Sequence, residues 1–247
     1  MMPVDGDNSI SQVADQSPRK TARMAGFFYL MFIITFILAS YLRSRIIVFG
    51  DVATTANNII SSQGVLRLGF MSELFSALFF VLAAWALYVL LKPVNRNLAL
   101  LLVLLNLGGV AIECINALNL FSALQFLSGA SYLSVFQTGQ LQALAMSFLN
   151  SYTNGFMITQ LFFSTWLFPL GYLVYKSRFL PRPLGILLIL DFFGILSWFL
   201  QFFLLPDYGI LSYPGLAISF VAEFSISLWL LIKGVKEPET LVGKVGS

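Results

Sequence analysis

The sequence predicts an all-α fold: a polytopic integral membrane bundle of six transmembrane helices with both termini in the cytoplasm. The 247 residues are 58% hydrophobic and only 10% charged, whereas roughly a quarter of the residues in a soluble domain are charged. Most of the apolar residues gather in runs of about 20, the length that a helix needs to cross the hydrocarbon core of a bilayer. Lys and Arg flank these runs instead of clustering on one polar face, which indicates topology signals and argues against a nucleic-acid partner.

Three parts follow from the distribution of apolar residues. Residues 1–18 are polar and have too little apolar surface to fold alone, so we expect a disordered cytoplasmic tail. Residues 19–236 form a single six-helix transmembrane domain, and residues 237–247 form a second cytoplasmic tail. The predicted spans cover residues 24–42, 68–91, 98–118, 154–175, 184–205 and 213–232.

The first apolar run has a signal peptide as its alternative interpretation, because Ala39-Ser40 could imitate a cleavage site. The run is longer than the roughly 7 to 15 apolar residues of such a peptide, which favours a retained span. Residues 43–67 then form an outer loop, in which Asp51 can cap a short helix that continues through Ile60. That helix lies along the membrane surface or belongs to an ordinary solvated loop; both interpretations stay open.

The second and third spans form a hairpin around the basic turn Lys92-Pro93-Val94-Asn95-Arg96. Beyond it, no charged residue occurs from Cys114 through Tyr175. This stretch is too long for one membrane-crossing helix and too uncharged for a soluble loop. We therefore expect an outer segment over residues 119–153, in which residues 136–149 form an interfacial or re-entrant helix that is too short to span the bilayer.

The distribution of basic residues supports this topology. Three of the 14 Lys and Arg residues fall in predicted outer loops, namely Arg43, Arg45 and Arg67. The other 11 fall in predicted cytoplasmic segments: Arg19, Lys20, Arg23, Lys92, Arg96, Lys176, Arg178, Arg182, Lys233, Lys236 and Lys244. Because short cytoplasmic loops collect basic residues, this bias predicts cytoplasmic termini.

Missing residue types exclude much chemistry. The chain has no histidine and one cysteine, Cys114, so haem ligation by imidazole, zinc sites that use histidine and Ser-His or Cys-His nucleophiles are excluded. The sequence contains no P-loop, dinucleotide-binding glycine pattern or EF-hand loop. We therefore expect no cofactor, no metal and no enzymatic activity.

Ionisable and amide groups inside the spans are the candidate ligand-binding or ion-binding residues, because a charge at the bilayer centre costs at least about 2.5 kcal/mol. Glu73 and Glu113 lie at matched depth with Arg67 nearby, which indicates either a neutralised structural cluster or a site. Glu223 lies near the middle of the sixth span and is the strongest candidate. The full candidate set is Glu223, Glu113, Glu73, Arg67, Asn106, Asn116 and Asp191.

Several short motifs carry a family resemblance. They are Ala22–Gly26, Leu87–Asn95, Gly171–Ser177 with Leu180-Pro181, and Leu228–Gly234. In this order they resemble an uncharacterised bacterial membrane family, domain of unknown function 4386, over residues 21–236. The resemblance implies a six-helix bacterial inner-membrane protein with no assigned activity. Family members often carry an arginine where this chain has Asn106, so a shared role for a buried cation is not implied here.

Two functions fit these observations. The first is a non-enzymatic bundle that binds or transports a cationic or small polar ligand through buried carboxylates. The alternative is a structural or accessory membrane protein whose acidic residues only stabilise helix packing or an interface with another copy or an unknown protein partner. A lipid-processing enzyme is remote, because no metal-binding acidic motif is present.

Overall fold

The computed structural model describes residues 18–48 and 50–235, and this part of the chain is all-α without a strand. The predicted tail at 237–247 and residues 1–17 of the predicted tail at 1–18 lie outside the described residues, whereas Pro18 belongs to the first helix. The helices and short helical turns are α1 (Pro18–Ser44), α2 (Val52–Ser61), α3 (Gln63–Leu91), α4 (Arg96–Phe126), η1 (Ser131–Leu133), α5 (Thr138–Thr165), α6 (Leu167–Lys176), α7 (Arg182–Leu204), η2 (Pro206–Ser212), α8 (Tyr213–Leu228) and η3 (Trp229–Lys233).

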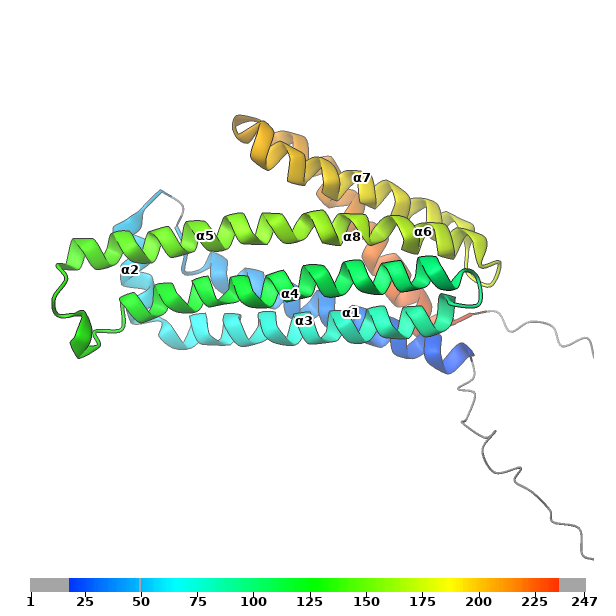
Figure 1. The fold of residues 1–247 in the computed structure, drawn as a ribbon, viewed down its shortest axis with the longest axis horizontal. Coiled ribbons are helices and arrows are strands. Elements are labelled where there is room, and N and C mark those ends of the chain that lie inside the picture. The colour runs from blue at the N-terminus through cyan, green and yellow to red at the C-terminus, as the bar shows by residue number, and fades with distance from the viewer. Residues whose placement is uncertain (1–17, 49, 236–247) are drawn as a thin grey trace, which may run out of the picture.

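Six helical stretches among these residues are long and apolar enough to cross a membrane, which confirms the predicted fold class. They are α1, α3, α4, α5 with α6, α7, and α8 with its flanking turns. The chain is therefore a multi-pass membrane protein. Both described chain ends lie at one end of the bundle, where Gly234 packs beside the Arg19 side chain. We call this end the basic end, because the turns that contain Lys92 and Arg182 lie there too (Figure 1).

One sequence expectation is wrong. Residues 136–149 form no separate re-entrant or interfacial helix: α5 begins at Thr138 and runs without interruption to Thr165, and α6 continues it to Lys176. No proline occurs between 138 and 165, so nothing in the backbone chemistry stops the helix there. The break comes at Trp166, because Pro169 has no N–H with which to bond the Thr165 carbonyl.

The three longest helical stretches extend well beyond what a bilayer requires. The helices α3, α4 and α5 with α6 contain 29, 31 and 39 residues, whereas about 20 suffice to cross the hydrocarbon. They run side by side along the long axis and extend past the others at the end where α2 lies, which we call the α2 end (Figure 1). There, Ile59 of α2 joins Leu66, Leu120 and Leu149 in a second hydrophobic core.

The α2 helix begins as the sequence predicts. Asp51 occupies the N-cap, and its carboxylate accepts hydrogen bonds from the Thr54 backbone N–H at 2.9 Å and the Thr54 hydroxyl at 2.6 Å. These bonds lower the pKa of the exposed Asp51 carboxyl. Asn58 then donates to the Ile46 carbonyl at 3.0 Å and ties α2 to the end of α1.

The helices α7 and α8 form a pair that diverges from α5 toward the α2 end (Figure 1). Two glycines allow their close crossing, since a Cβ atom on Gly215 would lie 2.5 Å from the Gly194 carbonyl oxygen. Small residues at such contacts are the usual means by which membrane helices approach each other.

Candidate functional site

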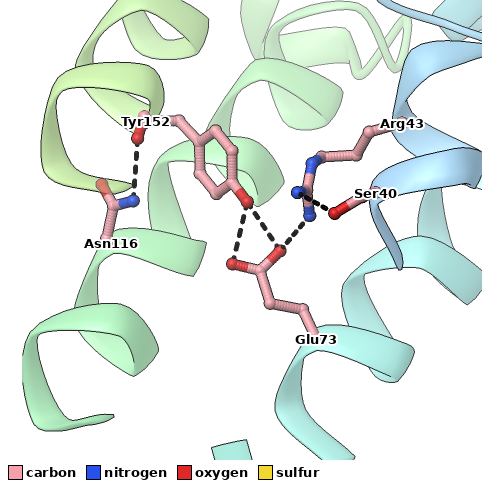
Figure 2. Close-up of polar contacts among 5 residues, drawn as sticks. All are labelled: Ser40, Arg43, Glu73, Asn116 and Tyr152. Carbon is pink, nitrogen blue, oxygen red and sulfur yellow. Dashed lines mark hydrogen bonds and ion pairs between the residues drawn. The ribbon is translucent and has the colours of Figure 1, made fainter. Parts of the chain in front are cut away.

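An ion pair joins α1 to α3 near the α2 end. The Arg43 guanidinium donates from Nη1 to Glu73 Oε2 at 2.7 Å and from Nη2 to the Ser40 hydroxyl at 3.3 Å. The Tyr152 hydroxyl of α5 also donates to this carboxylate and lies 2.9 Å and 2.8 Å from its two oxygens. Figure 2 shows Glu73 held between Arg43 on one side and Tyr152 on the other, so three helices meet at one carboxylate.

The third contact in this cluster is electrostatic. The Arg43 guanidinium carbon lies 5.1 Å from the centre of the Tyr152 ring, within the range of a cation–π interaction. Counting about 1.5 Å per helical residue from Arg23 and Lys92 at the basic end, both Arg43 and Glu73 lie about 30 Å away. This distance matches the thickness of the hydrocarbon core. The cluster therefore lies near the hydrocarbon boundary opposite the basic end.

A hydrogen bond from the Asn116 side chain joins α4 to α5 beside this cluster. Its side-chain N–H donates to the Tyr152 carbonyl at 2.9 Å (Figure 2), and its Oδ1 accepts from Asn119 at 3.1 Å. Gly155 leaves the space for it, since a Cβ atom there would collide with the Asn116 amide. Asn116 is therefore satisfied by the protein itself and positions the helix that carries Tyr152.

Glu113 lies one turn before Asn116 and has a different environment. Its side chain is 4% exposed, and its buried Oε2 has no hydrogen-bond partner among the described residues. It interacts electrostatically with both Glu73 and Arg43. The sequence placed Glu73 and Glu113 at the same depth, and in the structure the two carboxyl groups lie near each other. Among the described residues, only Glu73 has a direct cationic partner.

A second polar cluster lies on α8. Glu223 accepts from the Tyr29 hydroxyl of α1 at 3.1 Å and from the Ser219 hydroxyl at 3.0 Å, so a neutral donor serves each carboxylate oxygen. Asp191 of α7 is completely buried and interacts electrostatically with Glu223. Neither Asp191 oxygen has a hydrogen-bond partner among the described residues.

A cavity of about 230 Å³ is lined by Glu113 and by two residues of the second cluster, Glu223 and Ser219. The polar residues that line it are Glu113 of α4, Gln160 of α5, and Ser219 and Glu223 of α8. Most of the remaining wall is aromatic or aliphatic: Phe32, Ile33, Phe36, Ile37, Phe80, Phe163, Trp166, Ile195, Trp198, Leu216, Phe220 and Phe224. Glu73 does not line the cavity, so two of the three predicted glutamates face the same space.

The aromatic wall is held by ring contacts. The Phe80 ring stacks on Phe32 at 4.0 Å between centroids and meets Trp166 edge to face at 4.7 Å. Tyr29 packs against Trp166 at 5.8 Å, which orients its hydroxyl toward Glu223. Packing of aromatic residues thus positions the donor that the carboxylate uses.

Two candidate residues form no hydrogen bond or ion pair with the carboxylates in the described part of the chain. Arg67 is exposed at the α2 end, where its guanidinium carbon lies 6.0 Å from the centre of the Phe121 ring. Asn106 is completely buried on α4, two turns before Glu113, and neither atom of its amide group has a partner among the described residues. The sequence analysis took Arg67 as the cation near Glu73 and Glu113. In the structure, the cation beside Glu73 is Arg43.

Sequence reasoning missed Arg43, Tyr29 and Tyr152 as site residues. Arg43 stands at the end of an apolar run, where it resembles an ordinary loop cation, and Tyr152 falls in a segment predicted to lie outside the bilayer. Arg43 could have been identified as the partner of Glu73 from its depth, since both residues lie equally far from the basic end.

The described residues contain no group of three or more His, Cys, Asp or Glu side chains placed to hold a metal ion. Carboxyl groups in an apolar cavity attract a cation or a hydrogen-bond donor, since burial of their charge without such a partner is costly.

Comparisons with known proteins place the chain in a family without an assigned activity. The profile of the family described as "Domain of unknown function (DUF4386)" matches residues 24–234. An "Uncharacterized protein" of Archaeoglobus fulgidus is 28% identical over 169 residues, which cover 65% of this chain and 80% of that protein. No solved structure matches the chain.

Proposed function

The chain belongs to the DUF4386 family, and we propose that it is a non-enzymatic membrane bundle that binds, and moves across the bilayer, a cationic or small polar ligand. The observation that carries this proposal is the cavity between α1, α4, α5, α7 and α8, into which both Glu113 and Glu223 open. An arginine neutralises Glu73, whereas Glu223 receives only the neutral donors Tyr29 and Ser219 on its two oxygens. A ligand cation in the cavity supplies the missing positive charge.

Transport also requires that the cavity be reached from a defined side. We place both termini in the cytoplasm of a bacterial inner membrane. This orientation is supported by the bias of basic residues toward one end and by the packing of Gly234 beside Arg19. The α2 end then faces outward.

Cysteine labelling tests the orientation. In a Cys114→Ala background, Ser131→Cys should react with a membrane-impermeant maleimide in intact cells, whereas Lys92→Cys should react only after the cells are opened. Both positions are exposed in the structure, so neither lacks access to the reagent. The reverse labelling pattern would contradict the proposed orientation.

Ligand-dependent stabilisation tests the binding function. The purified protein in nanodiscs is heated with choline, putrescine or benzyltrimethylammonium, each as the chloride salt. At least one cation should raise the unfolding temperature of the wild type, since a ligand that binds the folded state stabilises it. Glu223→Gln should abolish this increase, and Arg67→Gln, which changes an exposed arginine outside the cavity, should preserve it.

A structural or accessory role is the second candidate, favoured by the Arg43–Glu73 pair that neutralises one acidic residue within the bundle. If the role is structural, Glu223→Gln should lower the unfolding temperature, and no cation should change the unfolding temperature of the wild type or of the variant. This outcome would overturn the binding proposal.

A further inference from the structure

Two exposed residues of the cavity wall lie at the depth of lipid tails. Two of its lining residues, Ile37 of α1 and Phe220 of α8, are also exposed on the outer surface of the bundle, by 45% and 59%. Counting about 1.5 Å per residue from Arg23 and Lys233, both lie about 20 Å from the basic end. This depth is inside the roughly 30 Å hydrocarbon core. These two residues of the cavity wall, on α1 and α8, therefore face lipid tails.

The interior of the cavity suits an apolar body. Phe32, Phe80 and Trp166 form one continuous aromatic wall, and Phe163 meets Phe80 edge to face at 5.0 Å. An apolar cavity of about 150 Å³ accommodates a benzene molecule. A volume of about 230 Å³ therefore has room for one aromatic ring and a small attached group.

Two carboxyl groups line the cavity. Glu113, which is 4% exposed and lines the cavity, has no partner for its Oε2 among the described residues. Glu223 of α8 also lines the cavity. These carboxyl groups and the aromatic ring faces of the wall attract positive charge.

We propose that the ligand of this cavity is a lipophilic cation, one aromatic or branched apolar group with a single compact positive charge, which reaches Glu223 and Glu113 from the bilayer through an opening between Ile37 and Phe220. This inference rests on the proposed binding function and narrows its ligand class. A hydrophilic cation would have to leave water and cross the apolar wall, whereas a lipophilic cation already partitions into the membrane beside the opening. The aromatic lining selects for the apolar group, and the carboxyl groups select for the charge.

Three matched probes test the ligand class in nanodiscs: benzyltrimethylammonium, choline, and neopentylbenzene, the neutral isostere of the first. Binding is measured from the fluorescence of Trp166 and Trp198, which line the cavity. Benzyltrimethylammonium should bind at least 10-fold more tightly than either other probe. Glu223→Gln should weaken this binding at least 10-fold, and Glu113→Gln, which removes a group whose Oε2 is unpartnered, should weaken it several-fold even if the first variant fails to fold.

The remaining outcomes separate the two proposals. Choline that binds as tightly as benzyltrimethylammonium and depends on Glu223 would overturn the lipophilic ligand class and preserve the binding function. Equal binding of neopentylbenzene would identify a site for neutral apolar molecules and overturn both proposals. Absence of binding by every cation would also overturn both.

The route of access is tested by a larger side chain at the opening. Ile37→Phe should slow the association of benzyltrimethylammonium at least fivefold while the chain still folds. Ile34→Phe is the matched control, since Ile34 is equally exposed on α1 but does not line the cavity. Equal association rates in the two variants would overturn access between α1 and α8.

Discussion

The ion pair between Arg43 and Glu73 gives a prediction about stability that the structure allows to be worked through. Arg43 and Glu73 are 13% and 3% exposed, and 2.7 Å separates Nη1 from Oε2. Removal of one partner leaves the other charge buried without its counter-charge, which costs about 3–5 kcal/mol in soluble proteins. Because Arg43 keeps some contact with water, we expect the lower value of about 3 kcal/mol for Glu73→Met and for Arg43→Met.

The double variant separates the interaction energy between Arg43 and Glu73 from the energy of their contacts with other residues. Removing both charges leaves no unpaired charge from this pair, so Arg43→Met with Glu73→Met should lose less than the sum of the single losses, with a coupling energy of about 2 kcal/mol. The assay is unfolding by SDS in mixed micelles, followed by helical circular dichroism. Ser40→Ala is the control, because it removes only the contact of 3.3 Å and should change the free energy of unfolding by less than about 0.5 kcal/mol. Additive losses in the double variant would refute the assignment of a direct stabilising pair.

Further predictions concern the glycine contact and the α2 helix. Gly215→Ala should lower the free energy of unfolding by about 1–3 kcal/mol, since the new methyl group overpacks the crossing of α7 and α8; Gly209→Ala, where a Cβ meets nothing within 4 Å, is the control in the same SDS titration. Asp51→Ala should speed amide hydrogen exchange in α2 because the helix loses its cap. The bonds from Thr54 lower the folded-state pKa of Asp51, so its contribution is present above the ordinary carboxyl pKa and is lost as the pH falls through the lowered value. The protection factors of the α2 amides, which compare each observed exchange rate with the unstructured rate at the same pH, should therefore fall in acid in the wild type, and a variant that lacks Asp51 should lose this dependence.

The sequence predicted the number of spans because composition and helix length are local properties. Each run of about 20 apolar residues indicates a membrane helix whatever lies beside it. It also predicted the cap at Asp51, which depends on a side chain and a backbone N–H only three residues apart. The long α5 was missed because Gln140 and Asn150 break the hydrophobic pattern, although a helix that extends past the hydrocarbon needs no apolar pattern there.

The grouping of the carboxylates was harder to predict, because it depends on contacts between distant parts of the chain. The sequence placed Glu73 and Glu113 at one depth, and the structure brings them near each other. It did not indicate that Asp191 lies near Glu223 or that Tyr29, 194 residues before Glu223, donates to it. These pairings depend on how α1, α7 and α8 rotate about their own axes, which packing sets and spacing does not.

The second hydrophobic core at the α2 end constrains the order in which the protein can be made. Ile59, Leu66, Leu120 and Leu149 lie on four segments, and the last of these belongs to α5. In the orientation that we propose, the first three are translocated before α5 emerges from the ribosome, so their apolar faces are not yet covered by Leu149. A nascent chain that stops after α4 should therefore be bound by chaperones on the far side of the membrane and cut by proteases there, and completion of α5 ends that exposure.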